Sequence, residues 1–214
     1  VNGNVESKAI ESYIKIKPKD VTVTANNAEK LFGHEDPTFS ATVTGTLNQD
    51  KIQYEVGRPG VGKDEAVGTY EDALVATGDE IQGNYKVTYV AGDFEIKTNA
   101  EDLKFVEAET TGYNGVYDGA AHDAVTSVKV TGVNGEEIAA EDMTVEYRLS
   151  DEADWGKTPQ VTDVADSTAV QIRVTVANYD PITTTVQATV TQKPVTITTE
   201  SASKTYDASA LTAP

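Results

Sequence analysis

The residues best suited to chemistry in this sequence are acidic pairs, two histidines and a single tryptophan. The acidic pairs are Asp64-Glu65, Glu71-Asp72, Asp79-Glu80, Glu136-Glu137, Glu141-Asp142 and Asp151-Glu152, the last followed by Asp154. A glycoside hydrolase needs two carboxylates, but it holds them in a cleft against a sugar. Here the pairs fall among turn residues, which favours solvated loop charge. We therefore expect no catalytic residue and no enzymatic activity.

Metal binding is the second chemistry to weigh. His34 and His122 occupy related places, shortly after Phe32-Gly33 and Tyr117-Asp118 respectively. Because the sequence has no cysteine and no HExxH pattern, a zinc site is disfavoured and both histidines are expected in solvent-exposed turns. Calcium held by loop carboxylates between modules is the alternative, although no loop has the DxDxDG pattern of an EF-hand. No other cofactor is expected, and no residue can be assigned as a metal ligand.

Trp155 is the one candidate for a ligand contact. It lies in the acidic segment DEADWG, residues 151–156, where its ring could stack on a sugar. The other interpretation is a tryptophan folded over the end of a hydrophobic core. An internal lysine–asparagine or lysine–aspartate isopeptide bond is a separate hypothesis, for which the sequence shows no diagnostic pattern.

The composition limits the partners that the chain can have. Its 214 residues carry a formal net charge of −18, and the pI is near 4.3. Such a field repels phosphate backbones and anionic lipid, so neither nucleic acid nor a membrane is expected as a partner. No stretch approaches the ~20 apolar residues of a membrane-spanning helix. The lack of cysteine fits either the cytosol or a bacterial surface that does not rely on disulfides.

Short strands must position these residues. Alternating apolar and polar residues predict strands at 13–17, 21–25, 39–44, 52–56, 85–90, 93–97, 103–108, 124–131, 143–150, 169–177 and 182–191. Segment 69–76 is compatible with a strand or a helical turn, and a strand is favoured. Val21 and Val23 should face one core, and Val170, Ile172, Val174 and Val176 should lie together on one face of another strand. Because no segment of ten or more residues has a helical apolar period, the chain is predicted to be all-β.

The chain also repeats itself. The phrase Val21–Gly33 (VTVTANNAEKLFG) recurs at Val195–Asp207 (VTITTESASKTYD), and a weaker echo, NGVYDG, begins at Asn114. The predicted parts are the end of a preceding module or a linker strand (1–18), two modules (19–99 and 100–192), and the first strand and turn of an unfinished third module (193–214). Modules of this size suit Ig-like β-sandwiches. Since both ends of the chain fall within modules, we expect a piece of a longer protein.

Four phrases together resemble the MBG/YDG-type repeats, which are Ig-like modules found in tandem in large bacterial cell-surface proteins. They are KPVTITTESASKTYDASALT, LFGHEDPTFSATVTG, VGTYEDALVATGDEIQGNYKVTYVAGDFEIK and YNGVYDGAAHDAVTSVKVTG. The resemblance covers residues 18–214. It is clearer in the MBG-type first module, because the YDG-type second module reads VADS at 164–167 where the first has VGTY at 67–70. It implies tandem Ig-like antiparallel β-sandwich modules in an elongated arrangement.

The same resemblance implies a role outside the cell. The repeats would form the stalk of a secreted protein at the cell surface or cell wall, usually of a Gram-positive bacterium, and would space or present an adhesive domain. Their partners would then be the neighbouring repeats of the same chain. The alternative is an adhesin module that binds host glycan or a matrix protein through loops at a sandwich end.

Three tyrosines stand beside turn residues. Tyr70, Tyr85 and Tyr179 are placed where a ring can cap the core while its hydroxyl group bonds the backbone. We interpret them as residues that specify the fold.

Overall fold

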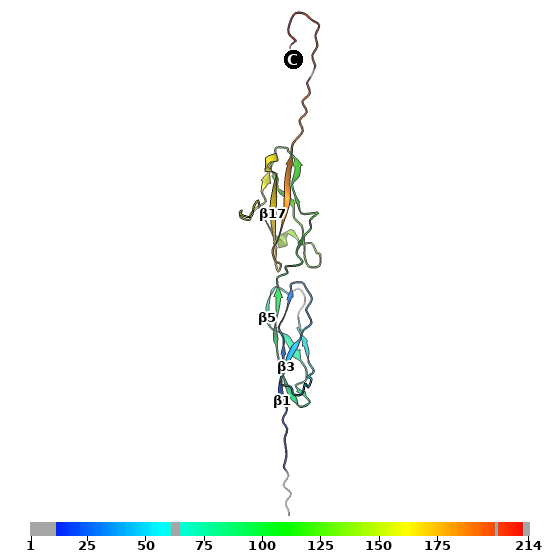
Figure 1. Cartoon of the computed structure of the whole chain (residues 1–214), viewed down its shortest axis with the longest axis vertical. Coiled ribbons are helices and arrows are strands. Elements are labelled where there is room, and N and C mark those ends of the chain that lie inside the picture. Colours follow the sequence, from blue (N-terminus) through cyan, green and yellow to red (C-terminus); the bar gives the residue numbers. More distant parts are fainter. Residues whose placement is uncertain (1–11, 61–64, 200, 212–214) are drawn as a thin grey trace, which may run out of the picture. The chain divides into compact units, whose positions relative to one another are not determined.

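The computed structural model describes residues 12–60, 65–199 and 201–211. Within these ranges the chain consists of strands and turns, with two short 3₁₀ turns, η1 (Ala140–Asp142) and η2 (Val164–Asp166) (Figure 1). No helix in the described part of the chain is long and apolar enough to cross a membrane. The prediction of an all-β chain is therefore confirmed.

The chain divides into two compact units. Unit 1 contains Val1–Leu103 and two later segments, Gly132–Glu136 and Val176–Pro181. Unit 2 contains Lys104–Thr131, Glu137–Thr175 and Ile182–Pro214. The turns at Gly132–Glu136 and Val176–Pro181 thus belong to the same compact unit as the predicted first module.

Unit 1 is built from two four-stranded sheets. One has the order β3 (Ala41–Thr44), β1 (Lys19–Ala25), β7 (Tyr85–Val90), β6 (Ile81–Gln82). The other has the order β2 (Ala28–Leu31), β8 (Gly92–Lys97), β5 (Gly68–Thr77), β4 (Glu55–Gly57). Most neighbours are antiparallel, but β1 pairs in parallel with β7, and β2 pairs in parallel with β8.

The inner faces of these two sheets form one hydrophobic core. Strand β1 contributes Val21, Val23 and Ala25, the alternate residues of its sequence, and all three are buried. They pack in one cluster with Leu74 of β5 and Phe94 of β8. The alternation that predicted the first strand therefore also predicted which face is buried.

Unit 2 is organised around a longer sheet. Its order is β11 (Asn114–Val116), β18 (Ile182–Thr191), β17 (Thr168–Val176), β15 (Met143–Arg148). Three two-stranded pairs accompany it: β9 (Lys104–Phe105) with β14 (Val130–Thr131), β10 (Thr111–Gly112) with β13 (Val125–Ser127), and β12 (His122–Asp123) with β16 (Gln160–Val161). Val170, Ile172 and Val174 of β17 are fully buried, as predicted. The Ig-like sandwich class expected from the sequence is confirmed.

Several predicted strands differ from those in the structure. No strand forms within the described residues 12–18, 192–199 or 201–211, where Tyr13, Ile14, Val195 and Ile197 are exposed. The physical reason is that a strand needs a backbone ladder with a second strand, and the sheets of the described residues do not include these segments. Residues 1–11, 200 and 212–214 of the two predicted flanking parts lie outside the described residues.

Other predicted strands exist but are shorter. The strand expected at 103–108 is reduced to β9, and that at 52–56 begins only at Glu55. The single strand expected at 124–131 is divided into β13 and β14. Each of these segments pairs over only two or three residues. Strands β9 and β14 pair with each other and β13 pairs with the equally short β10, whereas β4 pairs with one end of the longer β5.

Candidate functional site

Trp155, the predicted ligand contact, is half-buried in unit 2 against two arginine side chains. The guanidinium carbon atoms of Arg148 and Arg173 lie 4.4 Å and 4.6 Å from the centre of its ring. Both arginines are held by carboxylates, Arg148 by Asp151 and Arg173 by Glu146, each at 2.6 Å. The ring is thus part of a cation–π cluster outside the buried core. Its contact with a ligand stays a prediction.

The two histidines are half-buried, and each lies beside an aspartate. His34 Nε2 lies 2.6 Å from Asp102 Oδ2, and His122 Nε2 lies 3.1 Å from Asp118 Oδ1. The ring of His122 also stacks on Tyr113, with 4.3 Å between ring centres. Among the described residues, no three histidine, cysteine, aspartate or glutamate side chains are grouped so as to hold a metal ion. A calcium titration of the thermal midpoint would test the predicted alternative.

The three tyrosines are placed as the sequence predicted. The Tyr70 hydroxyl donates to the Ala66 carbonyl oxygen at 2.7 Å. The Tyr85 hydroxyl accepts from the backbone N–H of Leu47 at 3.1 Å, and the Tyr179 hydroxyl accepts from that of Val133 at 3.2 Å. Burial is the main cause that raises the pKa of Tyr179 above its ordinary value. These side chains specify the fold and are not reactive groups.

A compact charge cluster lies in unit 1. Arg58 donates to both carboxylate oxygens of Asp36, at 2.9 Å and 2.7 Å, and also to Glu65. Lys30 Nζ makes no well-aligned hydrogen bond within the described residues, but it lies 2.9 Å from Asp36 Oδ1 as an ion pair. The side chains of Lys30 and Arg58 are each only 2% exposed. Two cations and two anions therefore balance one another beside the core.

The electrostatics of this cluster keep Asp36 charged. The hydrogen bonds from Arg58, aided by Lys30, outweigh burial and hold the pKa of Asp36 below its ordinary value. In return, the hydrogen bond to Asp36 raises the pKa of Arg58 above its ordinary value. The guanidinium carbon of Arg58 also lies 4.2 Å from the ring centre of Phe94 in the core. All four charged groups are used in pairing, which indicates a structural role.

Asn99 is a fully buried polar residue that sequence reasoning did not single out. Its Nδ2 donates to the Phe32 carbonyl oxygen at 2.9 Å and to Asp102 Oδ2 at 2.8 Å. Its Oδ1 accepts from the backbone N–H groups of Glu101 and Asp102 at 2.9 Å and 3.0 Å. The backbone of Asn99 pairs with Asn178 and Asp180, at 2.9 Å and 3.2 Å. Every hydrogen-bonding group of Asn99 is thereby used.

Apolar contacts surround this polar centre in unit 1. The rings of Phe32 and Tyr179 lie 5.6 Å apart, centre to centre. Val133 lies so close to Gly33 that a Cβ atom there would come within 2.7 Å of Val133 Cγ1. Gly33 also has a φ of +79°, so both its backbone conformation and this contact require glycine. The turns 132–136 and 176–181 are therefore closely packed on the residues that follow β2 and β8.

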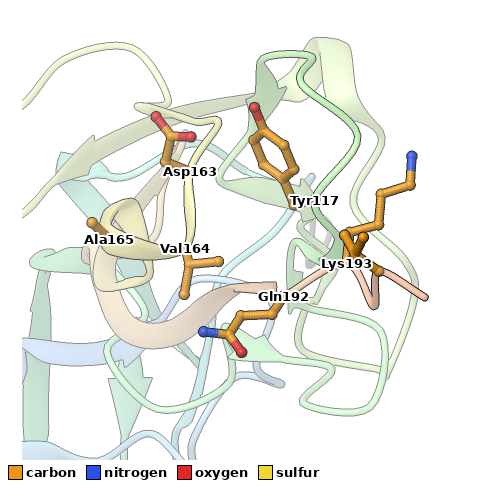
Figure 2. A pocket seen from close by; sticks show the side chains of 7 residues that line it. Tyr117, Asp163, Val164, Ala165, Gln192 and Lys193 are labelled. Atoms are coloured by element: carbon orange, nitrogen blue, oxygen red, sulfur yellow. The ribbon is translucent and has the colours of Figure 1, made fainter. Parts of the chain in front are cut away.

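A groove of about 590 Å³ lies in unit 2. Figure 2 shows the side chains that line it, which come from three segments: Tyr117 after β11, Asp163–Ala165 at the 3₁₀ turn η2, and Gln192 and Lys193 after β18. Tyr117 is 39% exposed and Val164 is 41% exposed, which is high for apolar side chains. The groove is open and partly apolar, and its lining residues carry no catalytic arrangement.

The sequence contained a local pattern from which the role of Asn99 could have been predicted. Asparagine side chains often accept hydrogen bonds from backbone N–H groups two residues on, and Asn99 stands two residues before Glu101 in a segment between strands. The groove had no such local signal, because its three segments are far apart in the sequence. Only the pairing of β11 and β17 with β18 brings those segments together.

Residues 21–95 match the family model of the MBG domain (YGX type). The resemblance expected from the sequence is thus confirmed for the first module. No curated protein sequence matches the chain.

Solved structures similar to the chain include three from Ig-domain proteins. IG1 and IG2 of DIP-gamma match with a TM-score of 0.31 and 10% sequence identity, over 80% of this chain and 98% of that chain. Extracellular domains 3–5 of Drosophila OTK match with a TM-score of 0.36 and 12% identity, over 81% of this chain and 60% of that chain. Dpr11 IG1 bound to DIP-gamma matches with a TM-score of 0.35 and 12% identity, over 78% of this chain and 96% of that chain.

Proposed function

Because its first module is an MBG domain of the YGX type, we propose that this chain is a non-catalytic part of the stalk of a bacterial cell-surface protein. In this role the modules space or present an adhesive domain outside the cell. Their partners are the neighbouring repeats of the same polypeptide. The strong negative charge keeps such repeats soluble and prevents their adsorption to anionic surfaces.

The observation that carries this proposal is the hydrogen bonding of Asn99. A spacer works only if the segments between its modules do not act as free hinges. Here the segment that follows β8 is held at Asn99 by bonds to Phe32, Asn178 and Asp180, all within unit 1. The segment after β8 is therefore ordered within unit 1 by specific contacts, and this order supports the proposed spacer role.

Small-angle X-ray scattering of the whole chain tests the proposal. We expect a narrow distribution of extended particles, and Asn99→Ala should broaden that distribution. A compact or freely jointed particle for the unmodified chain would contradict a spacer. Antibody labelling of intact cells that make the protein tests its location, with labelling only after lysis as the contrary result.

An adhesin is the second candidate function, and the half-buried Trp155 is the observation that favours it. Aromatic rings can stack on sugars, and Trp155 is the single tryptophan of the chain. A glycan array probed with the chain and with Trp155→Ala would decide. Binding that is lost in Trp155→Ala, but kept in the matched aromatic control Tyr206→Ala, would support an adhesin.

A further inference from the structure

The groove in unit 2 is built from the same positions that are covered in unit 1. In unit 1, β2 runs parallel to β8, and the N–H of Phe32 donates to the Lys97 carbonyl oxygen at 2.9 Å. In unit 2, β11 runs parallel to β18, and the N–H of Tyr117 donates to the Thr191 carbonyl oxygen, also at 2.9 Å. Phe32 and Tyr117 are therefore equivalent residues, one in each unit.

The other walls of the groove correspond in the same way. Strands β5 and β17 are the antiparallel neighbours of β8 and β18. The turn before β5 provides Val67, and the turn before β17 provides Val164 and Ala165. Residues 98 and 99 follow β8, just as Gln192 and Lys193 follow β18.

These equivalent positions differ in what covers them. In unit 1 the ring of Phe32 meets Tyr179, and the N–H of Val67 donates to Asn178 Oδ1 at 3.3 Å. In unit 2 Tyr117 and Val164 are exposed to solvent and border the groove (Figure 2). The same aromatic and aliphatic surface is thus covered in one unit and open in the other.

The nearest glycines show a similar difference, Gly33 directly after Phe32 and Gly119 two residues after Tyr117. Gly33 has a φ of +79° and is covered by Val133, as described above. Gly119 has a φ of +82°, but a Cβ atom there would find only the Tyr117 hydroxyl, at 3.8 Å. The backbone beyond Tyr117 thus takes the left-handed conformation while the space next to it stays open.

We propose that the groove lined by Tyr117, Val164, Ala165, Gln192 and Lys193 is the docking surface for the end turns of a module that follows in the same polypeptide. The occupant is a pair of turns like Gly132–Glu136 and Val176–Pro181, presenting one tyrosine ring and one aliphatic side chain. This inference rests on the proposed stalk function and specifies how one repeat is held by the next.

The chemistry of the occupant recurs within this chain. Tyr179 accepts a hydrogen bond from the N–H of Val133, and Tyr85 accepts one from the N–H of Leu47. Each tyrosine follows a glycine or alanine and an asparagine, as Gly83-Asn84-Tyr85 and Ala177-Asn178-Tyr179. A turn that presents a tyrosine next to an aliphatic residue is therefore a repeated part of these modules. Leu47, the aliphatic residue next to Tyr85 in one of these turns, is 54% exposed.

The test is a chimera in which residues 194–214 are replaced by a second copy of residues 100–192, so that Lys193 stays in place. The appended copy brings its own Tyr179 turn to the position that follows β18. We expect the amides of Val164 and Ala165 to exchange with deuterium about 10-fold more slowly in the chimera than in the unmodified chain. Tyr179→Ala in the appended copy alone should restore fast exchange. Unchanged exchange beside a folded appended copy, verified by its additional Trp155 signal, would overturn the proposal.

A second pair of variants does not depend on exchange rates. Because Tyr117 is exposed in the unmodified chain, Tyr117→Lys should leave its thermal midpoint unchanged, whereas the equivalent Phe32→Lys should lower it. Equal destabilisation by both substitutions would show that Tyr117 serves the fold of its own unit, and would overturn the proposal.

The unmodified chain should show no protection of the groove that depends on protein concentration. Protection that grows with concentration would assign the groove to a second copy and would also overturn the proposal. Small-angle scattering of the same chimera separates the two hypotheses. Extended particles with an unprotected groove would contradict the docking proposal but not the stalk function. Freely jointed particles would contradict the stalk function.

Discussion

The ring of Phe32 meets the ring of Tyr179 edge to face, with 5.6 Å between centres and 79° between planes. This edge-to-face geometry is one of the two arrangements that aromatic pairs prefer. The hydroxyl group of Tyr179 extends the contact, because it accepts the N–H of Val133. Aromatic packing and a backbone hydrogen bond thus stabilise the same end of unit 1.

Two substitutions of Tyr179 should separate these contributions. Tyr179→Phe keeps the ring and loses only the hydrogen bond, so we expect a loss of about 1 kcal/mol in the free energy of unfolding. Tyr179→Ala also removes the buried ring, and a loss of about 3 kcal/mol is expected. Urea unfolding measures both. Tyr117→Phe is the matched control, and a control loss as large as that of Tyr179→Phe would contradict the assignment.

Asn99→Ala should destabilise unit 1 by about 2 kcal/mol in urea unfolding. The substitution leaves the Phe32 carbonyl oxygen and the N–H groups of Glu101 and Asp102 without their partner, and the site is buried. Asn84→Ala provides the control, since Asn84 is an exposed turn residue and its removal should cost less than about 0.5 kcal/mol. Equal losses in the two variants would show that the Asn99 side chain is not specifically required.

Acid should weaken unit 1 through Asp36. Arg58 and Lys30 hold the pKa of Asp36 below its value in the unfolded chain, which is about 4. A group with a lowered pKa stabilises the fold above that unfolded value, and the stabilisation is lost as the pH falls through the folded value. Urea unfolding at a series of pH values from neutral downward should therefore show a decline that begins below about pH 4.

Asp36→Asn should flatten this decline and cost about 3 kcal/mol near neutral pH, because Arg58 stays buried with a weaker partner. Glu71→Gln is the control, since Glu71 is exposed and lies outside the charge cluster. A decline of the same steepness in Asp36→Asn and in the unmodified chain would exclude Asp36 as its source.

The intact mass of the chain should equal the mass calculated from its sequence. Lys30 Nζ lies 2.9 Å from Asp36 Oδ1, which is the arrangement that an internal lysine–aspartate isopeptide bond would need. However, amide formation requires a neutral carboxyl group and a neutral amine, and Arg58 keeps Asp36 ionised. A mass lower by one water, absent in Lys30→Met, would show that the bond forms.

The strands with strong alternation could be predicted from the sequence. Residues 85–90 and 182–191 form β7 and β18 with the predicted bounds, since alternate apolar residues, Tyr85 and Val87 in β7 and Ala188 and Val190 in β18, are buried. Pairing partners could not be predicted in this way. Nothing local to Val21 indicates that β1 will lie parallel to β7, because that choice depends on how the two sheets close around the core.

The candidate site was predictable only in part. Tyr85 and Tyr179 stood out because they follow turn residues, and their hydroxyl groups bond the backbone as expected. Trp155 was singled out for its rarity, and its arginine neighbours could not be foreseen, because Arg173 lies on a strand distant in sequence. The groove depends on contacts between remote segments, which no local pattern encodes.

The parallel pairing of β2 with β8 has a consequence under tension. Strand β2 lies near the start of unit 1, and β8 leads out of it toward the later residues of the chain. A force that pulls these ends apart acts along the two strands, so their hydrogen bonds are loaded in shear and must break together. An antiparallel hairpin pulled at its open end would instead unzip one bond at a time. The first module is therefore built to resist being stretched before it unfolds.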